Sequence, residues 1–330
     1  MSRVYHRDQS GVPVIPYSTS QGSVAQFAAL KVVLKACLVS GYGVLPSAGW
    51  ALIAEGTNYL VLRNGSESGY VGFTWVAGAG GLLRIYLSKT FTGMSGDVMQ
   101  GDGLKSGTAA GLTAPQGLSL QLPFHSAANS SWYMIADEKT AILGFGGYSS
   151  NQELQGSFSP LVGHTLYFGE DSAGHAIAVG GANSAVSSGN SALFGGLFSA
   201  GGFTALTKPL TGLLVDTGAI NVHTPNLPVA SISTPRQDTI VKAPSVSLAK
   251  GGWYGDGAFA GWFRGLAFSP EIHFTGWTSY AAQILGRSTA MLVRDQNAPV
   301  DLGDAYTYFL RAGLFSSTPS FLVTDNPEFW

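Results

Sequence analysis

The chain has 330 residues, which allows about two domains, and its formal net charge is −2. It is 45% hydrophobic, so material for a core is ample, but only 11% of its residues are charged, against about 25% in ordinary soluble domains, which suits a protein whose faces are largely covered by neighbours. Its 17 Lys and Arg residues are too sparse to form the basic surface that nucleic acid or an anionic membrane requires, and its glycines lack the Gly-X-Y period of collagen.

Residues 1–20 are expected to form an extended arm, because each proline in this segment pushes the residue before it toward extended backbone geometry. A helix follows, since Ser23 stands three positions before Gln26, the spacing of a capping box. Apolar residues then recur at helical intervals: Phe27, Leu30, Leu34, Cys37 and Leu38. Gly41 and Gly43 are expected to end this helix, because glycine accepts the left-handed turn of a helix C-terminus.

From Trp50 onward the hydrophobic period changes from that of a helix to that of a strand. Alternating segments separated by short glycine-containing turns predict an antiparallel meander: residues 58–64, 69–76 and 82–88. Residues 93–117 are rich in glycine and are expected to be a loop. A second hairpin is predicted over residues 131–147, with its turn at Asp137, Glu138 and Lys139.

Beyond residue 150 the chain is rich in Gly, Ser and Ala, and residues 178–203 have no clear period, which fits a long loop or weak strands. Four prolines make residues 225–250 an extended linker or a sheet edge. Strand character returns in three later segments: residues 261–270, 288–295 and 320–325.

These patterns predict an α+β fold that is mainly antiparallel β. One N-terminal amphipathic helix packs on a β-meander, and a β-rich C-terminal half follows. We expect three units: the arm at 1–20, a helix-plus-sheet domain at 21–150, and a β-rich Gly/Ser-rich domain at 151–330.

The N-terminus lacks the apolar core of a signal peptide, and no apolar run reaches the roughly 18 residues of a membrane helix. We therefore expect synthesis and folding in a cytoplasm, no membrane insertion, and exit from the cell by assembly or lysis. A terminal aromatic such as Trp330 is common in outer-membrane barrels, but the repeated alternating strands of such barrels are missing. We expect Trp330 to dock into the chain's own core.

Cys37 is the single cysteine, which excludes an intramolecular disulfide framework and a cysteine-rich zinc site. It lies near the C-terminus of the predicted helix, where the helix dipole disfavours a thiolate, so core packing is expected. Gly41 and Gly43 do not predict a nucleotide-binding loop. Such a loop follows a strand and has a further glycine at the position that Pro46 occupies here.

No metal or cofactor site is predicted. The six histidines never occur at the short spacing of a local metal site: His6, His125, His164, His175, His223 and His273. The segment with Asp97 and Asp102 is similar to a calcium loop, but its carboxylates are too few for the ligand count of calcium. We expect an ordinary turn there.

No catalytic residues are predicted either, since a Gly-x-Ser-x-Gly elbow does not occur. A glycan hydrolase needs two carboxylates across a cleft, and the candidates by residue type are Glu170, Asp171, Asp256, Glu271, Asp301 and Asp304. Aromatic residues of the last third are able to stack on sugars but are also typical of a core or an interface: Trp253, Tyr254, Trp262, Phe263, Trp277 and Tyr280.

Several segments resemble, in the same order, a family of virion proteins of tailed bacteriophages that are encoded among tail and baseplate genes. The segments are VYHRDQSGVPV (4–14), LKACLVSGYGVLPSAGW (34–50), GTNYLVLRNGSESGYVGF (56–73), TGMSGDVMQGDG (92–103) and SSWYMIADEKTAIL (130–143). The resemblance is strongest over residues 1–150. Two later segments match more loosely, GLAFSPEIHF (265–274) and ILGRSTAMLV (284–293).

The resemblance implies a structural, upper-baseplate-like component of a phage tail tip, located in the virion, without catalytic residues or cofactors. The implied partners are other tail proteins (hub, distal tail and fibres) and further copies of this chain. In an assembly, the extended arm is expected to add a strand to a neighbour's sheet edge through Tyr5, Val12, Pro13, Val14, Ile15 and Pro16. The alternative is a receptor-binding or glycan-cleaving tail protein that acts in host attachment on surface polysaccharide.

Overall fold

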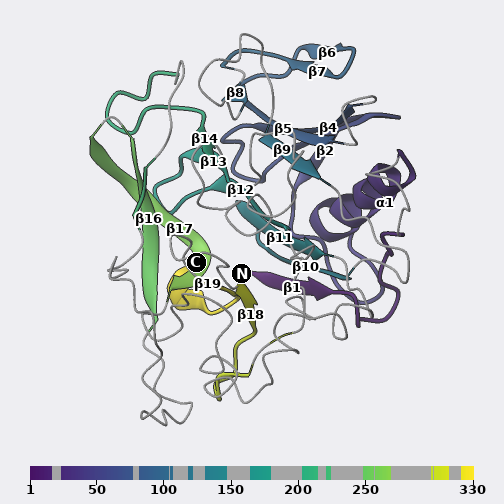
Figure 1. Cartoon of the computed structure of the whole chain (residues 1–330), viewed down its shortest axis with the longest axis vertical. Helices are drawn as coiled ribbons and strands as arrows, with labels where there is room; N and C mark the ends of the chain where they lie inside the picture. The colour runs from purple at the N-terminus through teal and green to yellow at the C-terminus, as the bar shows by residue number, and fades with distance from the viewer. Residues whose placement is uncertain are drawn as a thin grey trace, which may run out of the picture.

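The computed structural model describes residues 1–16, 24–76, 82–103, 105–106, 118–121, 131–146, 164–179, 203–214, 221–223, 248–255, 257–268, 299, 301–311 and 321–330. These residues form one α-helix and three larger antiparallel sheets (Figure 1). The predicted α+β class, mainly antiparallel β, is therefore confirmed. In the described part, no helix is long and apolar enough to cross a membrane.

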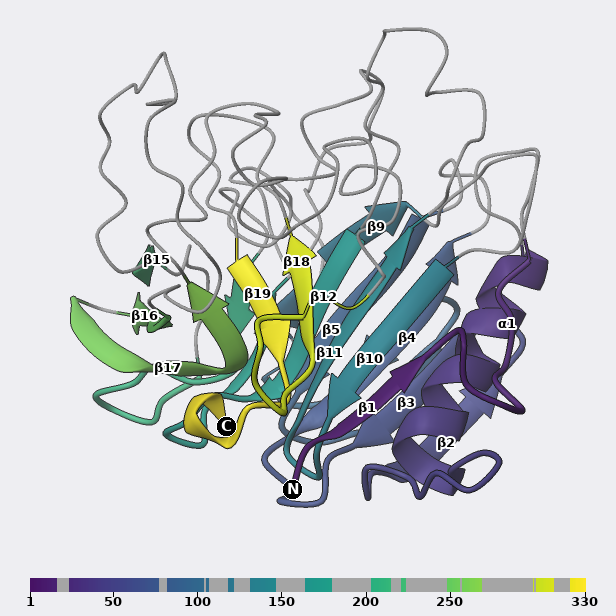
Figure 2. The ribbon, with the colours of Figure 1, turned by 90° about the horizontal axis from the view of Figure 1, so that it is seen from below.

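One sheet, called the central sheet here, lies between the other two (Figure 2). Its strands are, in spatial order, β1 (Arg3–His6), β10 (Ser131–Ala136), β11 (Thr140–Gly146), β12 (His164–Glu170), β13 (Ala176–Val179) and β14 (Phe203–Ala205). Along β10, Trp132 and Met134 pack in one core cluster and Tyr133 and Ile135 in another. Burial on both faces explains why these strands read as continuous apolar runs.

The predicted meander forms the second sheet. It contains β2 (Ala51–Gly56), β3 (Tyr59–Arg63), β4 (Tyr70–Val76), β5 (Leu82–Ser88), β8 (Lys105–Ser106) and β9 (Leu118–Gln121). The side chains of Leu60, Phe73 and Ile85 face the central sheet, with the helix beside them.

The glycine-rich segment expected to be a loop contains a hairpin, β6 (Gly93–Ser95) and β7 (Val98–Gln100). Gly96 supplies its turn with a φ of +60°. The hairpin is held because Met99 is fully buried against Gly72, where the Sδ atom lies 2.5 Å from the position a Cβ would take. Residues 104 and 107–117 of this segment lie outside the described residues.

The helix α1 (Val24–Lys35) continues into a π-helical turn, Ala36–Ser40, and ends at Gly41, as predicted. Gly41 has a φ of +77°, and a Cβ there would lie 2.5 Å from the Leu45 carbonyl oxygen. Cys37 is fully buried in the core. Ser23 lies outside the described residues, and the Gln26 side chain donates to the Pro16 carbonyl at 3.1 Å.

The third sheet, called the C-terminal sheet, covers the other face of the central sheet. Its strands are β15 (Asn221–His223), β16 (Ala249–Gly255), β17 (Ala258–Phe268), β19 (Phe321–Thr324) and β18 (Tyr308–Arg311). The strands predicted at 261–270 and 320–325 are present, whereas residues 288–295 lie outside the described residues.

The chain ends in a short 3-10 helix, Pro327–Phe329, and its terminal aromatic docks on its own fold. The Trp330 Nε1 atom donates to the Thr324 carbonyl at 2.7 Å, and the ring packs against the core between the central and C-terminal sheets. Gly265, with a φ of +68°, leaves room for this ring, since a Cβ there would lie 2.6 Å from Trp330.

The expected division into units at 1–20, 21–150 and 151–330 does not match the sheets. Strand β11 pairs along its length with β12, so the central sheet runs across residue 150. It also takes in β1 from the expected arm. The reason is that strand pairing joins segments that are distant in sequence, whereas changes in composition are local. Most of residues 178–203 and 225–250 lies outside the described residues.

Candidate functional site

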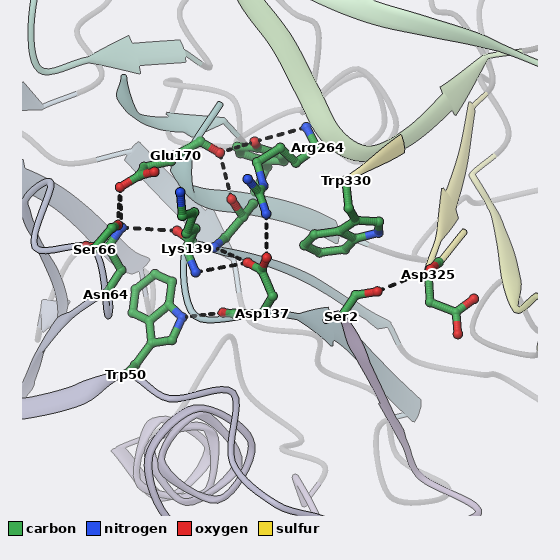
Figure 3. A network of polar contacts seen from close by, with 12 residues as sticks. Ser2, Trp50, Asn64, Ser66, Asp137, Lys139, Glu170, Arg264, Asp325 and Trp330 are labelled. Atoms are coloured by element: carbon green, nitrogen blue, oxygen red, sulfur yellow. Dashed lines mark hydrogen bonds and ion pairs between the residues drawn. The ribbon is translucent and has the colours of Figure 1, made fainter. Parts of the chain in front are cut away.

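The buried carboxylates gather at one end of the central sheet, where the turn between β10 and β11 lies beside the end of β12 (Figure 3). Asp137 is 6% exposed, and its Oδ1 atom accepts the backbone N–H groups of Lys139 and Thr140, both at 2.9 Å. Its Oδ2 atom forms an ion pair with Arg264 of β17. The Asp137 carbonyl also accepts the Trp50 indole N–H at 2.8 Å. Asp137 therefore links all three sheets.

Glu170 ties the same end of the central sheet to the meander sheet. Its Oε1 atom accepts from the Ser66 hydroxyl and from the Asn64 amide, the latter at 3.3 Å. The Asn64 amide also donates to the Lys139 carbonyl at 3.1 Å. Because both hydrogen-bond donors to the Glu170 carboxylate come from the turn between β3 and β4, Glu170 holds this turn against the central sheet.

Tyr167 connects this cluster to the C-terminal sheet. Its hydroxyl donates to the Glu170 carbonyl at 2.5 Å and accepts the backbone N–H of Arg264 at 3.2 Å. Complete burial raises the pKa of Tyr167 far above its ordinary value. The phenol is thus a neutral hydrogen-bonding link, and its proton is retained at physiological pH.

Asp171 is the most fully engaged carboxylate. Its Oδ1 atom accepts the backbone N–H groups of Ala173 and His175 at 2.9 Å, and its Oδ2 atom contacts His175 Nδ1 at 3.0 Å and accepts the Trp253 indole N–H at 2.8 Å. The side chain is completely buried. Its acceptor capacity is used in shaping the turn and in holding Trp253, a structural role.

The other carboxylates suggested for glycan cleavage do not join this cluster. Asp301 and Asp304 are exposed in the turn before β18, and Asp256 and Glu271 lie outside the described residues. Asp304 accepts the Tyr308 hydroxyl at 2.7 Å, and burial is the main cause that raises the pKa of Tyr308 to about 12. Among the described residues, no group of three or more His, Cys, Asp and Glu side chains is placed to hold a metal ion.

Sequence reasoning missed the partners of these carboxylates. Arg264 was recognised only as part of a strand, although a charged residue inside an apolar run signals a buried ion pair. Asn64 is the last residue of the predicted strand 58–64, and Ser66 lies in the turn that follows it. Nothing local connects them to Glu170, because the contact depends on how two sheets stack.

The aromatic candidates of β16 and β17 divide between the core and the surface. Trp253 and Phe263 are 1% exposed, whereas Trp262 is 39% exposed. Phe259, which was not among the candidates, is 41% exposed and lies 4.7 Å from Trp262 between ring centroids. Trp277 and Tyr280 lie outside the described residues.

The thiol and the glycine pair near the helix end have no catalytic partners in the described structure. Burial raises the pKa of Cys37 well above its ordinary value, so the thiol stays protonated. Gly41 and Gly43 shape the turn that follows the helix, with φ values of +77° and +56°. Of the histidines, only His175 belongs to the clusters described above, and His125 and His273 lie outside the described residues.

The expected assembly arm lies on the chain's own fold. Strand β1 pairs with β10, Tyr5 is fully buried, and its hydroxyl donates to the Pro46 carbonyl at 2.8 Å. The Trp132 indole donates to the Pro13 carbonyl at 3.0 Å, and Ile15 is fully buried. Of the remaining arm residues, Val14 is 46% exposed, and three are half-buried: Val12, Pro13 and Pro16. Within one chain, β1 thus extends the chain's own sheet, because Tyr5 fits its own core.

No family model matches this chain, and no curated protein or solved structure matches it.

Proposed function

We propose that this chain is a non-enzymatic structural component of a bacteriophage tail tip or baseplate, an oligomeric adaptor that joins tail proteins and fibres. The ordered resemblance of its first 150 residues to tail and baseplate proteins supplies the phage context. The structural observation that carries the adaptor role is the apolar outer face of α1, formed by Val24, Ala25, Ala28 and Val32.

The outer face of α1 reverses the usual polarity of a surface helix. Val24 is 45% and Val32 is 50% exposed, and the two alanines between them are exposed as well. A surface helix normally turns its charged residues to water and its apolar residues inward. Adjacent exposed apolar residues of this kind supply the apolar centre of a contact surface, and a stable interface would extend beyond them to about 800 Å² on each partner.

The lysines of α1 are turned away from this face. Lys31 is 8% exposed, and its Nζ atom donates to the Gly56 carbonyl at 2.5 Å. Lys35 forms an ion pair with Glu55 of β2 at 2.8 Å. The helix uses its charges to fix itself to the edge of the meander sheet, and its outer face is left uncharged for a partner, as in the centre of protein interfaces.

Mass spectrometry of purified virions of the phage that encodes the chain tests the proposal. The chain should be present in several copies per particle, and its absence from the particles would overturn the proposal. Light scattering of the purified chain tests the adaptor surface. Val32→Glu should lower the oligomeric mass, while Gln100→Glu, which adds the same charge at an exposed position of β7, should not. An unchanged mass in Val32→Glu would reject this face as the contact.

A further inference from the structure

The hairpin of β16 and β17 lies on the side of the molecule opposite α1 (Figures 1 and 2), and it carries a pair of exposed aromatic rings. Phe259 is 41% exposed and Trp262 is 39% exposed. Their ring centroids are 4.7 Å apart, and the ring planes are inclined by 57°. Burying either ring would be favourable, so their joint exposure on a strand marks a contact site.

The backbone of the hairpin holds this aromatic pair in place. Gly252 lies opposite Trp262 in the strand register, and a Cβ at Gly252 would lie 2.7 Å from the Phe259 ring. The absent side chain therefore lets the Phe259 ring lie over the backbone beside Trp262. Tyr254, opposite Phe259, supports that ring edge-on at a centroid distance of 5.4 Å. The aromatic pair is held in place by strands before any ligand binds, which lowers the entropic cost of binding.

A hydrogen-bond donor lies at the rim of the aromatic pair. The exposed Ser172 accepts the backbone N–H of Trp262 on its Oγ atom and donates its own N–H to the Trp262 carbonyl, both at 2.9 Å. Its hydroxyl proton makes no hydrogen bond with the described residues. A hydroxyl carries one donor besides its acceptor positions, so Ser172 retains a donor for a ligand.

We propose that Phe259 and Trp262 form a binding site for an uncharged glycan, with Ser172 as a hydrogen-bond donor at its rim. The face of an aromatic ring is partly negative and attracts the C–H groups on the flat side of a sugar ring. Gly252, Tyr254 and Ser172 beside the pair carry no charge, and the carboxylate of Asp171 against Gly261 is completely buried, which matches a neutral sugar.

The size of the exposed aromatic surface also favours a sugar over a protein partner. Fully burying an aromatic side chain removes about 150–250 Å² from water, so two rings exposed at 41% and 39% offer no more than about 200 Å². A stable protein interface covers about 800 Å² on each partner. The aromatic pair matches one or two sugar rings.

The test is isothermal titration of the full chain with neutral hexasaccharides of glucose, galactose, N-acetylglucosamine and rhamnose, with a hexauronate as the charged probe. At least one neutral probe should bind saturably. Trp262→Ala and Phe259→Ala should each weaken this binding about tenfold, the loss expected for one ring contact. Trp262→Phe should retain part of it. The matched control is Tyr306→Ala, which removes an aromatic side chain of 40% exposure outside the hairpin.

Two results would overturn the proposal: no neutral probe binds, whether or not the hexauronate does, or binding is equal in Trp262→Ala and in the original chain. Thermal unfolding of each variant shows whether it is folded before its affinity is interpreted. The proposal does not depend on the position of the chain in a tail. A Trp262→Ala virion that keeps the chain in normal amount would separate glycan binding from assembly.

Discussion

The end of the central sheet and the β16–β17 hairpin have opposite arrangements of polar and apolar groups. At the sheet end, the carboxylates of Asp137, Glu170 and Asp171 are buried and engaged by donors from neighbouring sheets. On the hairpin, the aromatic rings of Phe259 and Trp262 are exposed. Residue type alone suggested chemistry for Glu170 and Asp171, and a turn for Asp137. Their contacts give these side chains structural roles, whereas the proposed glycan site lies at the exposed rings.

The largest expected difference is between the buried Phe263 and the exposed Trp262, which are neighbours on β17. Phe263→Ala should destabilise the fold by about 4 kcal/mol, because the Phe263 ring is 1% exposed and its loss leaves a cavity. Trp262→Ala should cost less than about 1 kcal/mol, since that ring is 39% exposed. Urea unfolding of both variants measures the difference. Equal losses would mean that Trp262 is a core residue and would break the contrast.

Asp137→Ala should lower the free energy of unfolding by about 3 kcal/mol, because it leaves Arg264 buried without its ionic partner and removes the turn contacts. The control is the adjacent, exposed Glu138→Ala, which should stay within about 0.5 kcal/mol of the original chain. Chemical denaturation followed by circular dichroism gives both values. A loss below that of the control would show that Asp137 is not a structural link.

Asp171→Asn should cost about 2 kcal/mol, because the amide replaces one acceptor with a donor that faces the indole N–H of Trp253. The same exchange at the exposed Asp301 should have little effect. Fluorescence-detected unfolding is suitable, since the environment of Trp253 changes as well. If Asp171→Asn unfolds like the original chain, the hydrogen bonds to Asp171 do not stabilise the fold.

The smallest expected effect comes from Glu55 beside α1. The Lys35 hydrogen bond is the main cause that lowers the pKa of Glu55 from its ordinary value of 4.5. The contact with Lys35 therefore stabilises the fold fully at pH values above about 4.5. This stabilisation is lost as the pH falls through the lowered pKa of Glu55 in the folded chain. Glu55→Gln should cost about 0.5 kcal/mol at neutral pH, as expected for a partly exposed pair. The difference should vanish in acid, and a constant difference would contradict the ionic origin.

Local patterns predicted the elements that local forces determine. The helix, its end at Gly41, the meander and the hairpin around Asp137 all follow from periodicity and turn residues. The position of the central sheet did not follow, because the pairing of β11 with β12 and of β1 with β10 joins distant segments. The continuous apolar runs of these strands were the available signal for burial on both faces.

The two exposed rings could not be identified from a period of two. A register shift beside Trp253 and Tyr254 interrupts the alternation, so Phe259 and Trp262 are exposed while Ala260 and Gly261 between them are buried. Such a bulge re-aims side chains on the strand. Arg264 inside an apolar run signals a buried ion pair, but its partner Asp137 could not be predicted, since the contact depends on the stacking of two sheets.

The pairing of β1 (Arg3–His6) with β10 (Ser131–Ala136) also means that β1 stays unpaired until β10 has been synthesised. Tyr5 is translated well before its cross-strand partner Met134. At about 5–20 residues per second, the 129 positions from Tyr5 to Met134 leave β1 unpaired for roughly 6 to 26 seconds. During synthesis, the unpaired strand β1 is therefore accessible to chaperones or to another nascent copy of the chain.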